Sequence, residues 1–181
     1  EIEFRQAVEK SIDYAKALQV PSVNILAGKQ PNHLEYSTCV ETFIKNLRLA
    51  SVMLSEHAIQ PVFEMINGKD MPHFLVQYVA QAQEMIEAVH HPALKMQYDC
   101  YHMSMMGEDV FEALKENIHD IGHIQFADCP GRNEPGTASI PYPDIFQWLN
   151  QSQYQGYVAA EYRPLNHSQD SFAWKKQFFA N

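Results

Sequence analysis

Hydrophobic residues recur along the chain in two alternating patterns. Segments with an apolar residue every three or four positions predict helices, and the short apolar runs between them predict buried strands. The first helical segment, for example, places Phe4, Val8, Ala15 and Leu18 on one face. The predicted helices cover about residues 3–18, 38–57, 75–89, 111–121, 144–149 and 168–179, and the predicted strands cover 23–27, 61–66, 93–103, 122–127 and 157–162.

Three helix starts carry a capping signal. Thr38 with Glu41 matches a capping box, and Asp70, two residues before Pro72, has the residue type of an N-cap. Asp109 is expected to cap the helix that contains Leu114.

This alternation of strands and helices predicts an α/β fold with a parallel sheet. The length of 181 residues suits a single domain with a sizeable core. No apolar run reaches the roughly 18 residues that a membrane-spanning helix needs. Ligands of such parallel sheets gather beyond the carboxyl ends of the strands.

Four predicted strands carry an oxygen-bearing side chain near that end: Glu64, Asp99, Gln125 and Glu161. Carboxylates that point at one place repel each other, and burying them is costly unless a cation joins them. Oxygen ligands of this kind suit a hard divalent ion, Mg²⁺ or Mn²⁺. The alternative is that each acid caps a loop or pairs with a nearby Arg or Lys.

Two histidines accompany these residues. His102 lies three residues beyond Asp99, and it could bond a substrate oxygen or a backbone carbonyl at the edge of the sheet. His123 precedes Gln125 by two residues and is expected deeper in the fold, where it would orient a ligand of the ion.

The segment from 129 to 143 is rich in Gly and Pro and is too long for a plain connection, so we expect it to serve a site. Its Arg132 is suited to bind a substrate carboxylate, although an ion pair with Glu134 would also account for it. Arg163 would either contact the substrate or hold this loop.

Charge and cysteine content narrow the possible partners. The net charge of −9 disfavours nucleic acid, whose phosphates need a basic surface, but permits a small anionic substrate. The three cysteines, Cys39, Cys100 and Cys129, have no metal-site spacing and suggest reduced thiols in a cytoplasm. The acidic opening from Glu1 to Arg5 is unlike a signal peptide.

Several motifs together resemble the hydroxypyruvate isomerase family of the xylose isomerase-like (β/α)8-barrel superfamily. They are QYDCYHM at 97–103, GHIQFAD at 122–128, PGRNEPGTASIPYP at 130–143, AAEYRP at 159–164 and, more weakly, PVFEMIN at 61–67. The resemblance implies a divalent metal held by Glu64, Asp99, Gln125 and Glu161. It also implies Glu64 and Glu161 as the catalytic acid/base pair, with His102 and Arg132 as substrate contacts.

The family barrel has eight strands, and the five predicted here resemble the last five. We therefore expect residues 1–181 to be the carboxyl-terminal portion of a TIM barrel. The implied reaction interconverts an α-hydroxy ketone and an α-hydroxy aldehyde through an enediolate, with hydroxypyruvate and tartronate semialdehyde as the first candidates and homo-oligomers possible.

A 2-oxo-tetronate isomerase and a ketose 3-epimerase of the same superfamily are the alternative enzymes. A catalytically inactive barrel fragment that acts as an interaction protein is the alternative of another class. A phosphodiester endonuclease is disfavoured, because it would need a basic groove and a cluster of zinc ligands that is richer in His.

Overall fold

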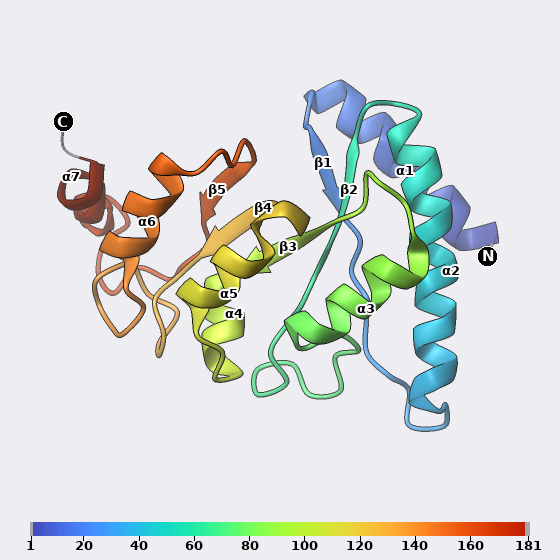
Figure 1. Ribbon diagram of the computed structural model, residues 1–181, viewed down its shortest axis with the longest axis horizontal. Helices are drawn as coiled ribbons and strands as arrows, with labels where there is room; N and C mark the ends of the chain where they lie inside the picture. Colours follow the sequence, from blue (N-terminus) through green and yellow to red (C-terminus); the bar gives the residue numbers. More distant parts are fainter. Residues whose placement is uncertain (1, 180–181) are drawn as a thin grey trace. The chain divides into compact units, whose positions relative to one another are not determined.

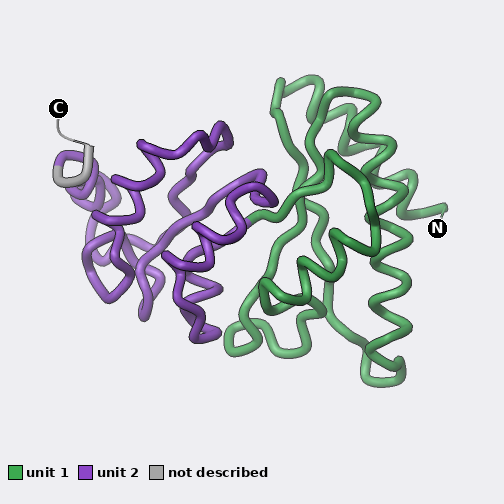
Figure 2. The backbone as a smooth tube through the Cα atoms, viewed as in Figure 1, with its two compact units in different colours: residues 1–97 green, residues 98–181 purple. Residues whose placement is uncertain are grey.

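The computed structural model describes residues 2–179, in two compact units. Unit 1 comprises residues 1–97 and unit 2 comprises residues 98–181, drawn in green and purple in Figure 2. Glu1, which opens the acidic N-terminal stretch, lies outside the described residues. Within residues 2–179, no helix has the length and apolar character needed to cross a membrane.

Unit 1 consists of parallel strands with helices packed against them (Figure 1). Strand β2 pairs with β1, where Ser22 lies opposite Gln60, and with β3, where Val62 lies opposite Lys95. Helix α1 packs against α2, and α2 packs against both β2 and α3. The elements are α1 (Ile2–Leu18), β1 (Ser22–Asn24), α2 (Tyr36–Ser55), β2 (Gln60–Glu64), α3 (Val79–Val89) and the first residues of β3 (Lys95–Asp99).

The core of unit 1 lies between α2 and β2. Leu47 and Leu54 of α2 are fully buried, as is Phe63 of β2. Phe43 meets the ring of Phe63 edge to face, with 5.9 Å between the ring centroids. Because β2 has a hydrogen-bonded neighbour on each side, this packing fixes where its last residue, Glu64, lies.

Unit 2 continues the same alternation. Strands β4 and β5 are parallel, with His123 opposite Tyr157, and α4 packs against β4. The elements are the end of β3, α4 (Cys100–Met105), α5 (Val110–Asn117), the 3₁₀ helix η1 (Ile118–Asp120), β4 (Ile121–Phe126), α6 (Tyr142–Gln151), β5 (Tyr157–Ala160), the 3₁₀ helix η2 (Asp170–Phe172) and α7 (Ala173–Phe179).

An aromatic cluster forms the core of unit 2 behind β4. The ring of Phe126 lies 5.7 Å from Tyr142, 5.2 Å from Phe146 and 5.3 Å from Trp174, measured between centroids. Offset and edge-to-face pairs at these distances stabilise a core beyond simple apolar burial. The cluster holds β4, α6 and α7 together and so fixes the end of β4, beside Gln125.

The parallel strands and intervening helices confirm the predicted α/β class. The prediction of one strand over residues 93–103 is wrong in its second half, because β3 ends at Asp99 and Cys100–Met105 is helical. The Asp99 carboxylate accepts hydrogen bonds from the first backbone N–H groups of that helix. An N-cap of this kind ends the strand in spite of the apolar residues that follow.

Two capping predictions are also wrong. Helix α2 begins at Tyr36 after Glu35, which makes no side-chain cap, so Thr38 lies inside the helix. Asp70 lies in a turn, where its N–H donates to the Asn67 side chain (2.7 Å), and α3 begins only at Val79. The Asp109 cap is confirmed, since its carboxylate accepts from the N–H groups of the next helix.

Candidate active site

Asp99 ends β3 and is 1% exposed. Its Oδ1 accepts from the N–H groups of Tyr101 (2.8 Å) and His102 (3.3 Å). Its Oδ2 faces the guanidinium of Arg132 at 3.4 Å and Nε2 of His102 at 3.7 Å. Burial raises the pKa of Asp99 to about 6, against the opposing effects of Arg132 and the two N–H groups. Arg132 therefore offsets only part of the cost of burying this carboxylate.

Gln125 and Glu161 face each other across neighbouring segments of unit 2. Gln125 lies on β4, and Glu161 directly follows β5. Gln125 Nε2 donates to Glu161 Oε2 at 2.6 Å. Because the Gln125 nitrogen donates to this carboxylate, the amide oxygen is the Gln125 atom suited to bind a cation. The Glu161 side chain is 52% exposed, so water or a small substrate can reach it.

Arg132 lies between two of the predicted ligands. Its guanidinium is 3.2 Å from Glu161 Oε1 and 3.4 Å from Asp99 Oδ2, and it lies over the ring of Tyr101 at 5.1 Å. The Glu134 carboxylate has a different partner, since it accepts from the N–H of Leu165 at 3.1 Å. Unit 2 thus brings Asp99, Gln125, Glu161 and Arg132 into one cluster.

The remaining predicted residues of unit 2 lie near this cluster. His102 is buried on α4, with its ring against Tyr101. His123 is half-buried on β4, and burial lowers its pKa, which favours the neutral ring. Arg163 contacts the loop through its backbone: its N–H donates to the Arg132 carbonyl (2.7 Å), and its carbonyl accepts from Asn133 Nδ2 (2.7 Å).

Glu64, the predicted ligand and base of unit 1, ends β2 and is 6% exposed. Its Oε2 accepts from Asn24 Nδ2 at 2.8 Å and from Gln97 Nε2 at 2.9 Å. These amides come from the strands on either side, and Gln97 lies directly opposite Glu64 in the register. Sequence reasoning missed both amides, although Gln97 shares a strand face with Asp99 by simple alternation.

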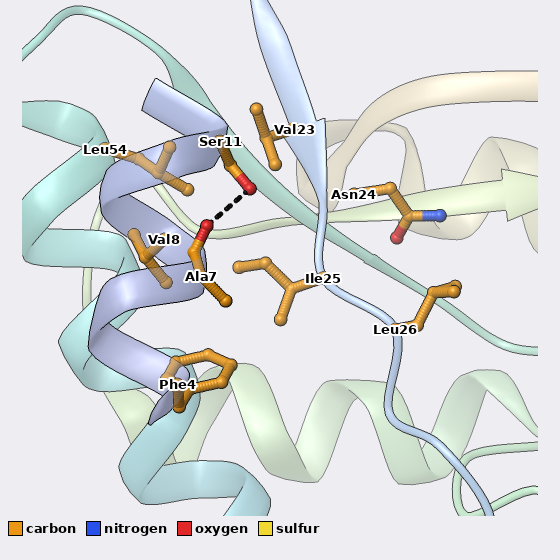
Figure 3. Close-up of a pocket in the computed structure, with 9 residues that line it drawn as sticks. All are labelled: Phe4, Ala7, Val8, Ser11, Val23, Asn24, Ile25, Leu26 and Leu54. Atoms are coloured by element: carbon orange, nitrogen blue, oxygen red, sulfur yellow. Dashed lines mark hydrogen bonds between the residues drawn. The ribbon is translucent and has the colours of Figure 1, made fainter. Parts of the chain in front are cut away.

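A separate pocket of unit 1, of about 270 Å³, lies between α1 and β1 (Figure 3). Val8, Ile25 and Leu54 form its apolar wall, and the Ser11 hydroxyl is turned to its own helix, where it donates to the Ala7 carbonyl. None of the residues labelled in Figure 3 is ionisable. Among the described residues, the lining of this pocket therefore offers no acid–base group.

The donor set of unit 2 fits a hard divalent cation. Asp99, Gln125 and Glu161 all offer oxygen atoms, which Mg²⁺ and Mn²⁺ prefer to nitrogen or sulfur. The raised pKa of Asp99 shows a buried carboxylate that would gain from further positive charge nearby. Glu64 of unit 1 offers the same kind of oxygen.

The sequence matches the profile of the xylose isomerase-like TIM barrel family over residues 1–178. Hydroxypyruvate isomerase of Escherichia coli is 37% identical over 174 residues, which are 96% of this chain and 67% of that protein. The 2-oxo-tetronate isomerase of Cupriavidus necator is 30% identical over 178 residues, 98% of this chain and 68% of that protein.

Among solved structures, a protein described as AP endonuclease, family 2, from Brucella melitensis superimposes with a TM-score of 0.93. It is 30% identical, and the match covers 98% of this chain and 69% of that one. The chain thus spans about two thirds of the length of these relatives. The sequence and fold comparisons agree. The chain belongs to the xylose isomerase-like TIM barrel family and, within it, to the hydroxypyruvate isomerases, which are isomerase enzymes.

Proposed function

We propose that the protein interconverts a carboxylated α-hydroxy ketone and the corresponding α-hydroxy aldehyde, with hydroxypyruvate and tartronate semialdehyde as the pair. One observation carries the proposal: Arg132, a side chain suited to bind a carboxylate, lies 3.2 Å from Glu161, the expected acid/base residue. Recognition of a substrate carboxylate would then lie directly beside proton transfer.

We further propose that Glu64, Asp99, Gln125 and Glu161 hold a divalent ion, Mg²⁺ or Mn²⁺. Each lies at or near the carboxyl end of its strand, where ligands of this fold class bind. When bound, such an ion polarises a carbonyl and stabilises the negative charge that develops on its oxygen.

The protein's own residues would move the protons. One glutamate, Glu64 or Glu161, takes the proton from the carbon that bears the hydroxyl, and the C–H electrons form the double bond of an enediolate. The other glutamate then protonates the neighbouring carbon, while a proton passes from the hydroxyl oxygen to the former carbonyl oxygen. Two carboxylates can exchange these roles in the reverse reaction.

Neighbouring side chains would orient these carboxylates. The Gln125 amide holds Oε2 of Glu161, and the amides of Asn24 and Gln97 hold Oε2 of Glu64. In the proposal His102 donates a hydrogen bond to a substrate oxygen, and His123 helps to orient Gln125, the metal ligand on the same strand. Arg163 holds the backbone of the loop that carries Arg132.

Glu161→Gln tests the proton-transfer role. We expect C–H exchange with D₂O, followed by proton NMR, to stop at the carbon that Glu161 serves, because an amide cannot accept that proton. Starting from hydroxypyruvate and from tartronate semialdehyde in separate experiments tests both carbons. Glu116→Gln, the same change on an exposed position of α5, is the matched control and should exchange like the wild type. Exchange at the wild-type rate in Glu161→Gln from both hydroxypyruvate and tartronate semialdehyde would remove Glu161 from the mechanism.

The two alternative substrates are tested by direct comparison. The Cupriavidus necator relative is a 2-oxo-tetronate isomerase, and Arg132 suits that carboxylated substrate as well as hydroxypyruvate. A ketose such as fructose offers Arg132 no carboxylate. We therefore expect kcat/KM to be higher for hydroxypyruvate or 2-oxo-tetronate than for fructose, and the better of the two acids to be the substrate.

The name of the Brucella melitensis protein raises the alternative of phosphodiester cleavage. The net charge of −9 opposes it, because DNA binding depends on cations that contact phosphates. Cleavage of an abasic-site duplex, without turnover of any hydroxy-carbonyl acid, would replace the isomerase proposal. Failure of both assays would favour the inactive interaction protein.

Some expectations stay predictions. The single domain over residues 1–181 and the formation of homo-oligomers are among them. The cytoplasmic location also stays a prediction, although the three cysteines are unpaired in the described part of the chain.

A further inference from the structure

Asp128, two residues beyond the end of β4, is fully buried. Its Oδ1 accepts from the N–H groups of Cys129 (2.9 Å) and Ile140 (3.1 Å). Its Oδ2 accepts from the N–H groups of Gly136 (2.9 Å) and Ala138 (2.8 Å). A carboxylate has about four acceptor positions. The backbone of one loop, residues 129–140, therefore fills the hydrogen-bonding capacity of Asp128.

The backbone of Asp128 also holds Arg132. Its carbonyl accepts from the Arg132 N–H (3.0 Å), and its own N–H donates to the Asn133 carbonyl (2.8 Å). Arg132 has a φ of +57°, in the left-handed region. For a residue other than glycine this conformation is unfavourable and persists only where the surroundings enforce it. Arg132 thus depends on the loop for its backbone geometry.

The same loop is joined to the segment that carries Glu161. The Arg132 carbonyl accepts from the Arg163 N–H, and Asn133 Nδ2 donates to the Arg163 carbonyl, both at 2.7 Å. At its other end, the Arg132 side chain reaches Glu161 Oε1 at 3.2 Å. A change in the course of residues 129–140 would therefore move the Arg132 guanidinium relative to Glu161.

We propose that Asp128 is a positioning residue: its buried carboxylate folds the loop of residues 129–140 and so places the Arg132 guanidinium for recognition of the substrate carboxylate. The inference rests on the proposed function, in which Arg132 binds that carboxylate. Asp128 itself touches no substrate, because all its acceptor positions face the loop.

Asp128→Asn perturbs this arrangement with almost no change in size. The new NH₂ group turns a donor toward two backbone N–H groups, which lose their acceptor and are left unsatisfied in a buried place. We expect the affinity for hydroxypyruvate to fall at least about tenfold, with KM rising more than kcat falls, as for the loss of a binding contact. A purely structural role would lower the amount of folded protein and leave KM unchanged.

A double-mutant cycle with Arg132→Ala tests whether Asp128 acts through Arg132. The readouts are kcat/KM and the dissociation constant of hydroxypyruvate by titration calorimetry. We expect Asp128→Asn to change both by less than about threefold once Arg132 is absent. An equal loss in both backgrounds, or a wild-type dissociation constant in Asp128→Asn, would overturn the inference.

Asp109→Asn is the matched control, because Asp109 also accepts two backbone N–H groups in unit 2 but caps α5 away from the loop. It should lower the melting temperature and leave KM unchanged. If Asp128→Asn does not fold, Ser139→Ala removes a milder contact of the same loop, from Ser139 Oγ to the Cys129 carbonyl (2.7 Å). Ser139→Ala should raise KM when Arg132 is present and leave KM unchanged in the Arg132→Ala variant. A wild-type KM in Ser139→Ala alone would count against the inference.

The two proposals fail in different ways. Binding of hydroxypyruvate without turnover by the wild type would end the isomerase proposal, while the calorimetric cycle would still decide the role of Asp128. A wild-type dissociation constant in Arg132→Ala would refute the positioning role and leave proton transfer to be judged on Glu161→Gln.

Discussion

The hydrogen bonds on Glu64 give a sharp prediction for Gln97→Leu. Gln97 is 7% exposed, and its Nε2 lies 2.9 Å from Glu64 Oε2. Leucine has a similar size and no donor, so it removes the bond without leaving a large cavity. Asn24 still donates to the same oxygen at 2.8 Å. The substitution therefore removes the Gln97 amide donor from a buried carboxylate.

The magnitude follows from that contact. A hydrogen bond to a charged group contributes about 1.5–3 kcal/mol net. Because Asn24 remains, we expect a loss near the lower end, about 2 kcal/mol in the free energy of unfolding. If the same bond orients Glu64 in the transition state, kcat falls by about 30-fold, since each 1.36 kcal/mol corresponds to a factor of ten.

Urea denaturation and the exchange of the substrate C–H proton measure the two effects. Gln81→Leu is the matched control, because the Gln81 amide oxygen also accepts hydrogen bonds in unit 1, from the backbone N–H groups of Gln77 and Tyr78, but does not contact Glu64. It should lower stability and leave kcat unchanged. Equal values of kcat in Gln97→Leu and Gln81→Leu would refute the orienting role of Gln97.

Two further predictions concern the ion and the core. Mg²⁺ or Mn²⁺ at about 100 times its dissociation constant should stabilise the folded protein by about 2.7 kcal/mol, measured as a rise in melting temperature. Asp99→Asn should make this rise smaller. If neither ion raises the melting temperature, the proposed metal site is wrong. Phe126→Ala should lower the free energy of unfolding, measured by urea denaturation, by about 3–5 kcal/mol, because it leaves a cavity among Tyr142, Phe146 and Trp174. A loss below about 1 kcal/mol would show that this cluster does not hold unit 2 together.

The periodic parts of the fold are readable from the sequence. Apolar spacing located the five strands and the longer helices, but not α4, because the spacing of apolar residues along one face is a local property of the chain. Asp109 was identified as a cap because its partners, the N–H groups of Phe111 and Glu112, lie two and three residues away. Information within one helical turn suffices for such features.

Features that depend on competition between local signals were missed. The run CYHM after Asp99 has the apolar character of a strand, yet the Asp99 carboxylate caps it as a helix. Thr38 and Glu41 have the capping-box spacing, but α2 begins two residues earlier, and Thr38 accepts with its carbonyl from Thr42 Oγ1 (2.9 Å) inside the helix. A residue pattern cannot show which of two adjacent starts has the better packing.

Long-range contacts were out of reach for a different reason. Asn24 and Glu64 are 40 residues apart, and their bond depends on the register of β1 against β2. That register is set by core residues such as Phe63, which the sequence alone does not align with its partners. The roles of Asn24 and Gln97 could therefore be recognised only once the strands were paired.

Asp99 and Asp128 show why a buried acid at a strand end is an ambiguous sign of a metal site. Both are almost fully buried, and both follow apolar runs. All four acceptor positions of Asp128 are taken by N–H groups of its own loop, so it could bind an ion only by releasing that loop. Asp99 uses Oδ1 for the start of α4 and directs Oδ2 toward the Arg132 guanidinium and the His102 ring. The direction of the second oxygen, rather than burial or residue type, is what favours Asp99 as a ligand and Asp128 as a support for the loop.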